Sequence, residues 1–576
     1  MNAPERQIST TVLVIGTGGS GLRAAIEVAE RGVDVLAVGK RPRQDAHTSL
    51  AAGGINAALG TMDAEDSWQQ HAADTIKESY LLANPHTVEI VTQGAERGIR
   101  DLERWGMDFA REDDGRISQR FFGAHTFRRT AFAGDYTGLE IQRTLVRKAE
   151  QLDVPILDHV YITRLLVRDN VVFGAYGFDQ ADGTRYLIHA DAVILAAGGH
   201  NRIWRRTSSR RDENTGDSFR LAVDAGARLR DPELVQFHPS GIIEPESAAG
   251  TLISEAARGE GGILRNALGE RFMAKYDPER MELSTRDRVA LAAYTEIQEG
   301  RGTENGGVWL DVSHLPRETI MTRLPRVYQT MMELQMLDIT TDPIEIAPTA
   351  HYSMGGVWVR PEDHQTDVEG LYAIGEASSG LHGANRLGGN SLIELLVYGR
   401  IVGQAAMEHA AGLDAQRRSA TAVAEARAEI DDLLAAEGRE NVRALQRAIR
   451  NLMTEYAGVV RSEEGLLAGL ADLDMIEGRM EDIGIHPDIA GFQDLAHAFD
   501  LKASALAARA TLEAALERRE TRGCHNRSDF PDTDPTLQVN LVWSPTDGVT
   551  REPIPAISPE IAELMREVDT AGKLVE

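Results

Sequence analysis

Residues 11–38 read TVLVIGTGGSGLRAAIEVAERGVDVLAV. An apolar run that ends at Ile15 predicts a strand, residues 22–30 have helical spacing, and residues 33–38 are apolar again. Between the strand and the helix stands the pattern G-x-G-x-x-G, as Gly16-Thr17-Gly18-Gly19-Ser20-Gly21. Its glycines allow a tight turn and a close approach of the backbone to a pyrophosphate, and free N–H groups at the helix N-terminus favour phosphate. The stretch therefore predicts a dinucleotide-binding turn.

Two later strands also end in glycines. Residues 192–197 run into Gly198-Gly199, and residues 371–374 run into Gly375-Glu376. Strands of this kind, far apart in the sequence, predict one parallel sheet assembled from distant segments, with an inserted domain between them. From about residue 413, Ala, Glu, Arg and Leu dominate at helical spacing, which predicts a helical domain. A short strand is expected at residues 537–543.

The chain is acidic, with 61 Lys and Arg residues against 89 Asp and Glu residues and a formal charge of −28. This composition argues against nucleic-acid binding, which needs a basic footprint. The single cysteine, Cys524, can form no internal disulfide and cannot hold an iron–sulfur cluster, which usually needs about four thiolates. No apolar run approaches the roughly 20 residues that cross a bilayer. The N-terminus, MNAPERQISTT, lacks the features of a secretion signal, so we expect the chain to stay in the cytoplasm.

Several further motifs resemble those of one family. They are AHTSLAAGGINAALG at residues 46–60, QFHPSG at 236–241, SEAARGEGG at 254–262, PTAHYSMGG at 348–356, HGANRLGGNSL at 382–392 and RRETRG at 518–523. In this order, and with Arg286-Asp287 between the third and the fourth, they resemble the flavoprotein subunits of succinate dehydrogenase and fumarate reductase. The resemblance extends over nearly the whole chain.

The resemblance implies FAD as the dinucleotide, linked covalently through its 8α-methyl group to the histidine that matches His47. The second strand ends Val38-Gly39-Lys40, without the acid that usually binds the ribose of NAD. The family commonly has Gln or Glu where this chain has Ala52, so a side-chain contact near the flavin is lost. The other FAD contacts that the resemblance implies are Gly16, Gly18, Gly19, Ser20, Gly21, Gly39, Lys40, Thr48, Ser49, Gly53, Gly54, Asp217, Glu376, Ser391 and Leu392.

A four-carbon dicarboxylate needs anion clamps and a polar cage. The guanidinium of Arg386 matches a carboxylate with two hydrogen bonds. His238 and His351 can donate to carboxylate oxygens, and Ser254 can add a hydroxyl contact. We expect these four residues to bind the substrate.

The family assigns the proton of the reaction to the arginine that matches Arg286. Arginine is a poor base because its pKa exceeds about 12, so it needs tight positioning and a relay that resets its charge. Glu255 and Arg258 are three residues apart and would share one face of a helix, where they could supply that relay. We therefore expect Arg286, Glu255 and Arg258 to be catalytic.

We predict an α/β fold: a Rossmann-like FAD-binding domain at residues 1–246 and 352–412, an inserted α+β capping domain at 247–351, a helical domain at 413–525 and a small C-terminal domain at 526–576. The predicted function is the catalytic subunit of succinate dehydrogenase. The predicted partners are membrane anchor subunits with quinone and an iron–sulfur subunit, which would together hold the chain at the cytoplasmic face of the membrane. We predict no metal site.

Three alternatives stay open. Fumarate reductase would run the same site in reverse. L-aspartate oxidase shares the fold, the HGANR run and the RRExRG segment, and residues 371–376 and 380–382 resemble it, but its members lack the flavin-linking histidine and have an asparagine-rich variant of Leu387-Gly388-Gly389. A scaffold that only retains FAD would have no need of the complete set of Arg286, His238, His351 and Arg386.

Overall fold

Strand β1 (Glu5–Ile15) is central to a seven-stranded sheet in the computed structural model, which describes residues 4–487 and 491–571. It pairs in parallel with β2 (Val35–Val38) on one side and β9 (Arg185–Leu195) on the other. β16 (Leu371–Ala373) also pairs in parallel with β9, so the parallel sheet built from distant segments is confirmed. The sequence did not reveal the antiparallel extension of this sheet by β8 (Val171–Asp179) and β7 (Val160–Arg168), nor the short edge strand β6 (Ile156–Leu157).

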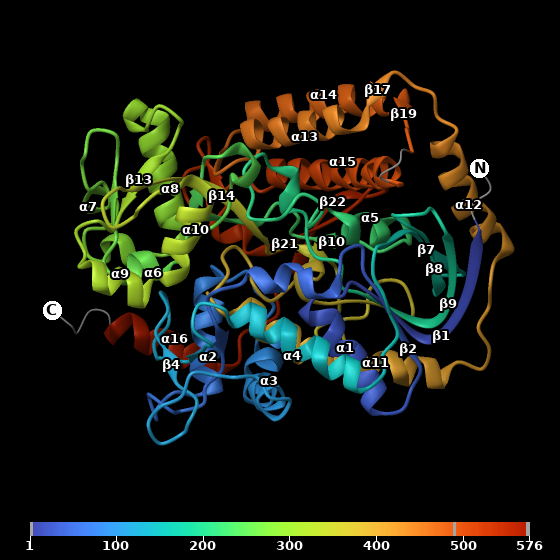
Figure 1. Cartoon of the computed structure of the whole chain (residues 1–576), viewed down its shortest axis with the longest axis horizontal. Helices are drawn as coiled ribbons and strands as arrows, with labels where there is room; N and C mark the ends of the chain where they lie inside the picture. The colour runs from blue at the N-terminus through green and yellow to red at the C-terminus, as the bar shows by residue number, and fades with distance from the viewer. Residues whose placement is uncertain (1–3, 488–490, 572–576) are drawn as a thin grey trace.

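Both faces of β1 are covered over residues 12–15, which is why this part of the strand reads as a continuous apolar run. Val12 and Val14 pack with helices on one face, and Leu13 and Ile15 belong to the core shared with the helical unit. Figure 1 shows these layers, with α1, α4 and α11 below the sheet and α13 to α15 along the top. The helices of this domain are α1 (Gly19–Glu30), α2 (Trp68–Glu78), α3 (Pro85–Arg104), α4 (Thr137–Gln151), α5 (Asp217–Asp224) and α11 (Asn390–Gly412).

The glycine turn between β1 and α1 needs its glycines for lack of space. Gly16 has a φ of +116°, and a Cβ there would lie 2.1 Å from the carbonyl oxygen of Ala196 at the end of β9. A Cβ at Gly21 would lie 1.9 Å from the carbonyl oxygen of Gly16. The turn is therefore pressed against the carboxyl ends of the strands, where open α/β sheets bind their ligands. A small sheet of β3 (Ile55–Asn56), β5 (Thr130–Ala131) and β4 (Gln119–Arg120) lies in the same domain.

The inserted unit has a four-stranded antiparallel sheet in the order β11-β14-β13-β12. Its strands β11 (Val235–Ile242) and β14 (Ile344–Ser353) are the segments by which the chain enters and leaves the unit, and they carry His238 and His351. The unit lies at the left of Figure 1. Its other elements are β12 (Ile263–Arg265), β13 (Val308–Asp311), α6 (Ala256–Gly259), α7 (Met273–Tyr276), α8 (Arg286–Glu296), α9 (Arg317–Arg323) and α10 (Pro325–Gln335).

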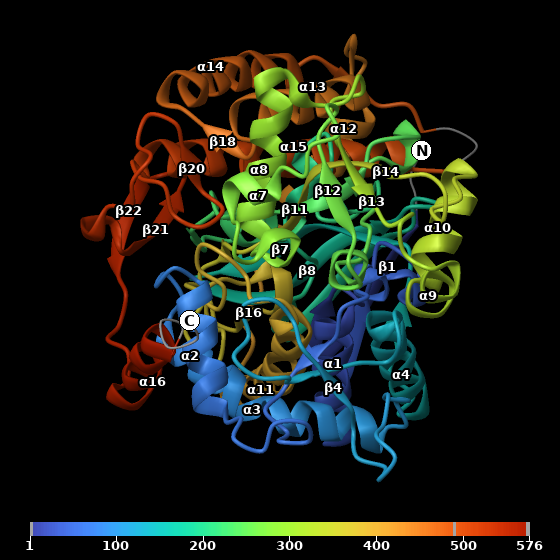
Figure 2. The same cartoon turned by 90° about the vertical axis from the view of Figure 1, so that its left-hand side faces the viewer.

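The predicted helical region contains α12 (Ala420–Leu434), α13 (Val442–Tyr456), α14 (Glu463–Met480) and α15 (Gln493–Glu517). Figure 2 shows α12 to α15 together at the top of the molecule, away from α2 and α3. Two short strand pairs, β17 (Glu440–Asn441) with β19 (Ile483–Gly484) and β18 (Val460–Arg461) with β20 (Asn526–Arg527), brace this region.

The strand expected at residues 537–543 is β21 (Val539–Ser544), which starts later because residues 535–537 form a 3₁₀ turn. It joins β10 (Leu229–Arg230), β15 (Gly356–Val357) and β22 (Gly548–Pro553) in a four-stranded sheet, and α16 (Pro559–Ala571) follows. No helix within residues 4–487 and 491–571 is long and apolar enough to span a membrane. Two predictions extend beyond the described residues. The N-terminal stretch without a secretion signal includes residues 1–3, and the predicted C-terminal domain includes residues 572–576.

Candidate active site

A cavity of about 2590 Å³ runs from the glycine turn to the inserted unit and the helical region. It exceeds the roughly 300–1,000 Å³ of ordinary small-molecule sites, so it has room for a dinucleotide and a substrate together. Most of the predicted site residues line it: Gly16, Gly18, Ser20, Gly39, Lys40, His47, Thr48, Gly53, Gly54, Asp217, His238, Ser254, Glu255, Arg286, His351, Glu376, Arg386, Ser391 and Leu392.

Four predicted site residues do not line this cavity. Gly19 and Gly21 lie in the first turn of α1, where a Cβ would meet Leu395 and the turn's own backbone. Ser49 lies below the surface, 3.4 Å from a guanidinium nitrogen of Arg210. Arg258 is buried behind Glu255, with its Nη1 donating to the carbonyl oxygen of Glu282 at 2.6 Å. The side chains of Ser49 and Arg258 therefore do not reach the cavity, and Gly19 and Gly21 contribute only backbone at the start of α1.

At the nucleotide end, the structure fits a pyrophosphate. α1 has Gly18 as its N-cap residue and no acidic residue in its first turn, so the N–H groups there face no competing negative charge. Lys40 Nζ lies 2.5 Å from Asp217 Oδ2. Burial lowers the pKa of Lys40, but the charges of Asp217 and Asp500 outweigh it and raise the pKa above its usual value.

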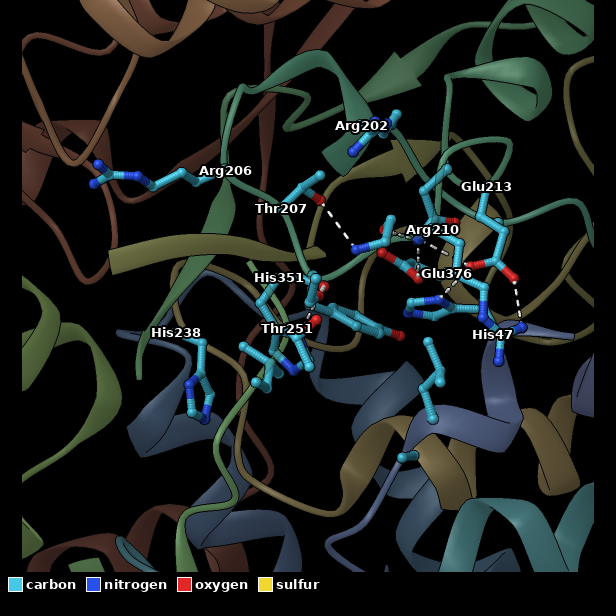
Figure 3. A pocket seen from close by; sticks show the side chains of 18 of the residues that line it. His47, Arg202, Arg206, Thr207, Arg210, Glu213, His238, Thr251, His351 and Glu376 are labelled. Atoms are coloured by element: carbon cyan, nitrogen blue, oxygen red, sulfur yellow. Dashed lines mark hydrogen bonds and ion pairs between the residues drawn. The ribbon is translucent and has the colours of Figure 1, made fainter. Parts of the chain in front are cut away.

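His47 is oriented by a residue that the sequence did not single out. Figure 3 shows the His47 ring at the cavity wall beside Glu213, whose Oε2 is 3.0 Å from His47 Nδ1. Burial lowers the pKa of His47, but the hydrogen bond and charge of Glu213 outweigh burial and raise it. Burial raises the pKa of Glu213, but His47, Arg210 and Arg41 bring it down to about 2. With Nδ1 engaged, the described residues give Nε2 no hydrogen-bond partner, and Nε2 is the ring nitrogen free to bond.

Glu376 lines the same cavity near His47 (Figure 3). Its carboxylate accepts from Asn201 Nδ2 at 2.7 Å and from the backbone N–H of Ser353 at 3.0 Å. Burial is the dominant effect and raises the pKa of Glu376, although His47 and these hydrogen bonds oppose it. A half-buried acid with one oxygen held by two hydrogen bonds suits recognition of a ribose hydroxyl.

At the other end of the cavity, two guanidinium groups meet at one amide. Arg286 Nε and Nη2 lie 2.9 and 2.8 Å from Glu255 Oε2. Gln236 Oε1 accepts from Arg386 Nη2 at 3.1 Å and from Arg286 Nη1 at 3.4 Å. Gln236 was missed as a site residue, although it stands two residues before His238 on β11, a spacing that places both on one face of a strand.

Arg386 is a buried cation without an acidic partner. Its other hydrogen bond goes to Ser391 Oγ at 2.9 Å, and its guanidinium lies 4.4 Å from the ring centre of Tyr352. Within the described part of the chain, Arg386 forms no ion pair with any carboxylate. Burial and the charge of Arg286 lower the pKa of Arg386 to about 10. A buried charge of this kind needs an anion, and the cavity leaves room for one.

Two neutral imidazoles complete this end. The rings of His238 and His351 meet edge to face with centres 5.4 Å apart. Burial and the neighbouring arginines hold the pKa of each ring well below its usual value. The backbone N–H of Ser240 donates to His238 Nδ1 at 3.2 Å, so the neutral ring carries its proton on Nε2. His238 therefore acts as a hydrogen-bond donor and adds no charge.

Comparison with known proteins agrees with this geometry. Residues 11–392 match the FAD binding domain family, and residues 446–555 match the C-terminal region of fumarate reductase flavoproteins. The chain is 41% identical over 533 residues to one subunit of the CoM/CoB fumarate reductase of Methanothermobacter marburgensis, covering 92% of this chain and 96% of that protein. It is 36% identical to the succinate dehydrogenase flavoprotein subunit of Rickettsia bellii, covering 90% of each. It is similar in structure to Mycobacterium smegmatis Sdh1, with a TM-score of 0.89 and 36% identity over 99% of this chain and 98% of that chain.

Proposed function

We propose that this chain, which belongs to the family of succinate dehydrogenase and fumarate reductase flavoproteins, is an FAD-dependent catalytic subunit that interconverts succinate and fumarate. The observation that carries the proposal is Arg386, a buried cation with two neutral imidazoles nearby and the Arg286–Glu255 pair beside it. This set matches a dianion with one carboxylate at each end. The one carboxylate in this set, Glu255, is already paired with Arg286.

In the proposed mechanism, Arg386 binds one substrate carboxylate and His238 and His351 donate to carboxylate oxygens. Arg286 exchanges the proton at the substrate carbon, and Glu255 holds its guanidinium in place. Burial raises the pKa of Glu255, but Arg286 and Arg258 bring it down to about 2, so its carboxylate stays charged. FAD, when bound, would supply the hydride acceptor or donor.

We further propose a covalent link from His47 Nε2 to the flavin. The bond of Nδ1 to Glu213 supports this, because it fixes the ring and leaves the other nitrogen for the link. Denatured protein should then show a fluorescent flavin band on a gel. A dark band from protein purified with its flavin would refute the link, and a His47→Ser variant should lose the band while it still binds FAD.

The iron–sulfur partner and the membrane anchors with quinone are also proposals. Cys524 is the one thiol in the sequence and is buried, where its pKa is raised well above the usual value. It cannot supply the thiolates of a cluster. Electrons would leave through a partner protein, and the chain would lie at the cytoplasmic face of the membrane through that partner. Identification of the copurifying subunits tests this.

Fumarate reductase is the second candidate, because the chain is 36% identical to the Rickettsia succinate dehydrogenase subunit but 41% identical to the Methanothermobacter fumarate reductase subunit. One experiment separates the candidates: succinate with an oxidised dye, fumarate with a reduced dye, and aspartate with oxygen, measured side by side. We expect turnover in the first two assays, and their ratio gives the preferred direction. Activity confined to aspartate would establish the oxidase instead.

The proton role of Arg286 is tested by Arg286→Lys. Lysine keeps the positive charge but cannot keep contacts from Nε and Nη2 to Glu255 and from Nη1 to Gln236. We expect kcat to fall by at least about 10³-fold, within the usual range for a lost proton-transfer group, with the flavin content unchanged. Arg288→Lys, exposed on the same helix, is the control. Substantial turnover in Arg286→Lys would remove Arg286 from the proposed mechanism.

A further inference from the structure

Arg120 lines the large cavity but has no part in the proposed mechanism. It is the last residue of β4, and side chains alternate along a strand, so Arg120 points away from the buried Gln119. Its Nη2 donates to the carbonyl oxygen of Gly53 and, at 3.3 Å, to that of Ala52. Both carbonyls belong to the short segment that follows His47 along the cavity wall. The guanidinium is therefore fixed against this segment.

The surroundings of the Arg120 guanidinium are aromatic. The guanidinium lies 4.5 Å from the ring centre of Phe132 and 5.5 Å from that of Phe122. Among the residues that the structure describes, Arg120 forms no ion pair, and its Nε is buried without a hydrogen-bond partner. Aromatic faces attract a cation but do not cancel its charge. Arg120 therefore presents an uncompensated positive charge at the cavity wall.

This charge persists at physiological pH. Burial lowers the pKa of Arg120, while the charges of Asp135 and Glu255 oppose burial. Arginine starts from a pKa above about 12, so it stays protonated. Ala52, whose carbonyl Arg120 contacts, has only a methyl group as its side chain and offers the guanidinium no carboxylate.

Two other arginines of the cavity have partners of their own. Arg286 is paired with Glu255, and Arg386 would be neutralised by a substrate carboxylate. Within residues 4–487 and 491–571, the hydrogen bonds of Arg120 go only to backbone carbonyls. Its charge therefore stays the same when a substrate binds or a product leaves.

We propose that the Arg120 guanidinium raises the redox potential of the flavin by stabilising the negative charge that the ring system gains on reduction. This inference rests on the proposed function and on FAD as the cofactor. Succinate gives up a hydride, which carries two electrons and one proton to the ring, and a second proton, which leaves through Arg286. The reduced ring then holds one more negative charge than the oxidised ring until a proton from solvent neutralises it. A cation fixed against the segment that carries the proposed link stabilises the reduced form more than the oxidised form.

The test is a matched pair of variants of the holoenzyme, Arg120→Gln and Arg120→Lys. Both keep an N–H donor for the two carbonyls, but only lysine keeps the charge. Spectroelectrochemical titration measures the midpoint potential of the flavin. In Arg120→Gln we expect it to fall by about 30 mV or more, which corresponds to at least a tenfold change in a two-electron equilibrium. Arg120→Lys should stay close to the wild type.

A second measurement separates charge from packing. The pH at which the reduced flavin takes up its second proton should rise in Arg120→Gln, because the lost cation no longer opposes protonation. The kcat for succinate oxidation should fall more than the kcat for fumarate reduction, since the ring accepts a hydride less readily. Arg128→Gln is the control: Arg128 is exposed, follows β4 in the same loop and pairs with Asp63. This control should change neither the potential nor the rates.

A wild-type potential in Arg120→Gln would overturn the inference. Equal shifts in Arg120→Gln and Arg120→Lys would also overturn it, because Arg120 would then act by holding the segment and not by its charge. If Arg120→Gln does not retain its flavin, Ala52→Glu brings a carboxylate beside the intact Arg120, with Ala52→Gln as its neutral control. The potential should then be lower in Ala52→Glu, and equal potentials would contradict the inference. Absence of succinate and fumarate turnover in the wild type would instead overturn the proposed function, while the potentials still decide the role of Arg120.

Discussion

The hydrogen bond between Glu213 and His47 decides which nitrogen of the imidazole can bond to a flavin. Glu213→Gln keeps a hydrogen-bond acceptor near Nδ1 but removes the negative charge that stabilises a positively charged ring. We expect covalent incorporation of FAD to slow at least about tenfold, consistent with the loss of about 1.4 kcal/mol or more of charge stabilisation. Non-covalent binding should remain. Flavin fluorescence of the denatured protein, measured against time after FAD addition, checks this.

Asp212→Asn is the matched control, because Asp212 lies one residue away, contacts Arg41 at 3.5 Å and does not line the cavity. Covalent flavin that forms in Glu213→Gln at the wild-type rate would show that the carboxylate is not needed. The sequence could point to His47 through its motif, but not to Glu213. These residues are 166 positions apart, and no local pattern around Glu213 marks it as the partner of an imidazole. Motifs reveal residues that recur together, whereas partners brought together by the fold alone stay hidden.

At the scale of elements, α15 is tied to the end of β2 by a buried cluster of charges. Asp500 Oδ1 of α15 lies 3.5 Å from Lys40 Nζ and accepts the hydroxyl of Tyr161 at 2.8 Å. Lys40→Met would leave Asp217 and Asp500 together without their cation. We expect it to lower the free energy of unfolding by about 3 kcal/mol, in the range for breaking a buried ion pair. Asp500→Asn, which leaves Lys40 its shorter pair with Asp217, should cost about 1 kcal/mol. Urea denaturation at saturating FAD measures both. The control is the half-exposed pair of Lys502 on α15 with Glu429 on α12, since Lys502→Met should cost under about 1 kcal/mol.

The same cluster has a defined pH dependence. Burial raises the pKa of Asp500, but the charge of Lys40 and the hydrogen bonds from His497 and Tyr161 outweigh burial and lower it. A carboxyl with a lowered pKa in the folded state stabilises the protein above its unfolded pKa of about 3.9 and loses that contribution as the pH falls. The difference in stability between the wild type and Asp500→Asn should therefore shrink below about pH 4. A constant difference would mean that Asp500 contributes by packing and not by charge.

The elements themselves differ in how well the sequence predicts them. β1, α1 and β2 follow from apolar runs and a glycine turn, which are local features. The ends of β9 and β16, which lead into Gly198 and Gly375, follow from the same pattern. The antiparallel strands β7 and β8 do not, because their burial on both faces removes the alternation that would mark them. The chain enters and leaves the inserted unit along β11 and β14, not through loops. The sequence does not predict this either, because it depends on pairing between segments about a hundred residues apart.

The net charge of the whole molecule is −28, so at long range it repels the proposed dianionic substrate. The cavity wall, by contrast, attracts a dianion. Fourteen arginines line it, and within the described part of the chain ten of them form no ion pair with a carboxylate: Arg120, Arg202, Arg205, Arg206, Arg211, Arg326, Arg386, Arg443, Arg447 and Arg450. Screening decides between the two effects, because the Debye length falls from about 30 Å at 0.01 M salt to about 10 Å at 0.1 M and about 3 Å at 1 M.

At low salt the substrate feels the distant acidic surface as well as the wall. Near 0.1 M only charges within about 10 Å still act, and these are the arginines of the cavity. We therefore expect kcat/KM for the dicarboxylate to rise from 0.01 M to about 0.1 M salt and to fall again towards 1 M. The double variant Arg443→Gln and Arg447→Gln on α13 should lower the maximum of kcat/KM severalfold with kcat unchanged. Arg439, just before this helix, pairs with Asp482, and Arg439→Gln should not lower that maximum. A steady rise with salt would show that the net charge of the chain outweighs its arginine-lined cavity. A double variant that matches the wild type at every salt concentration would show that Arg443 and Arg447 do not guide the substrate.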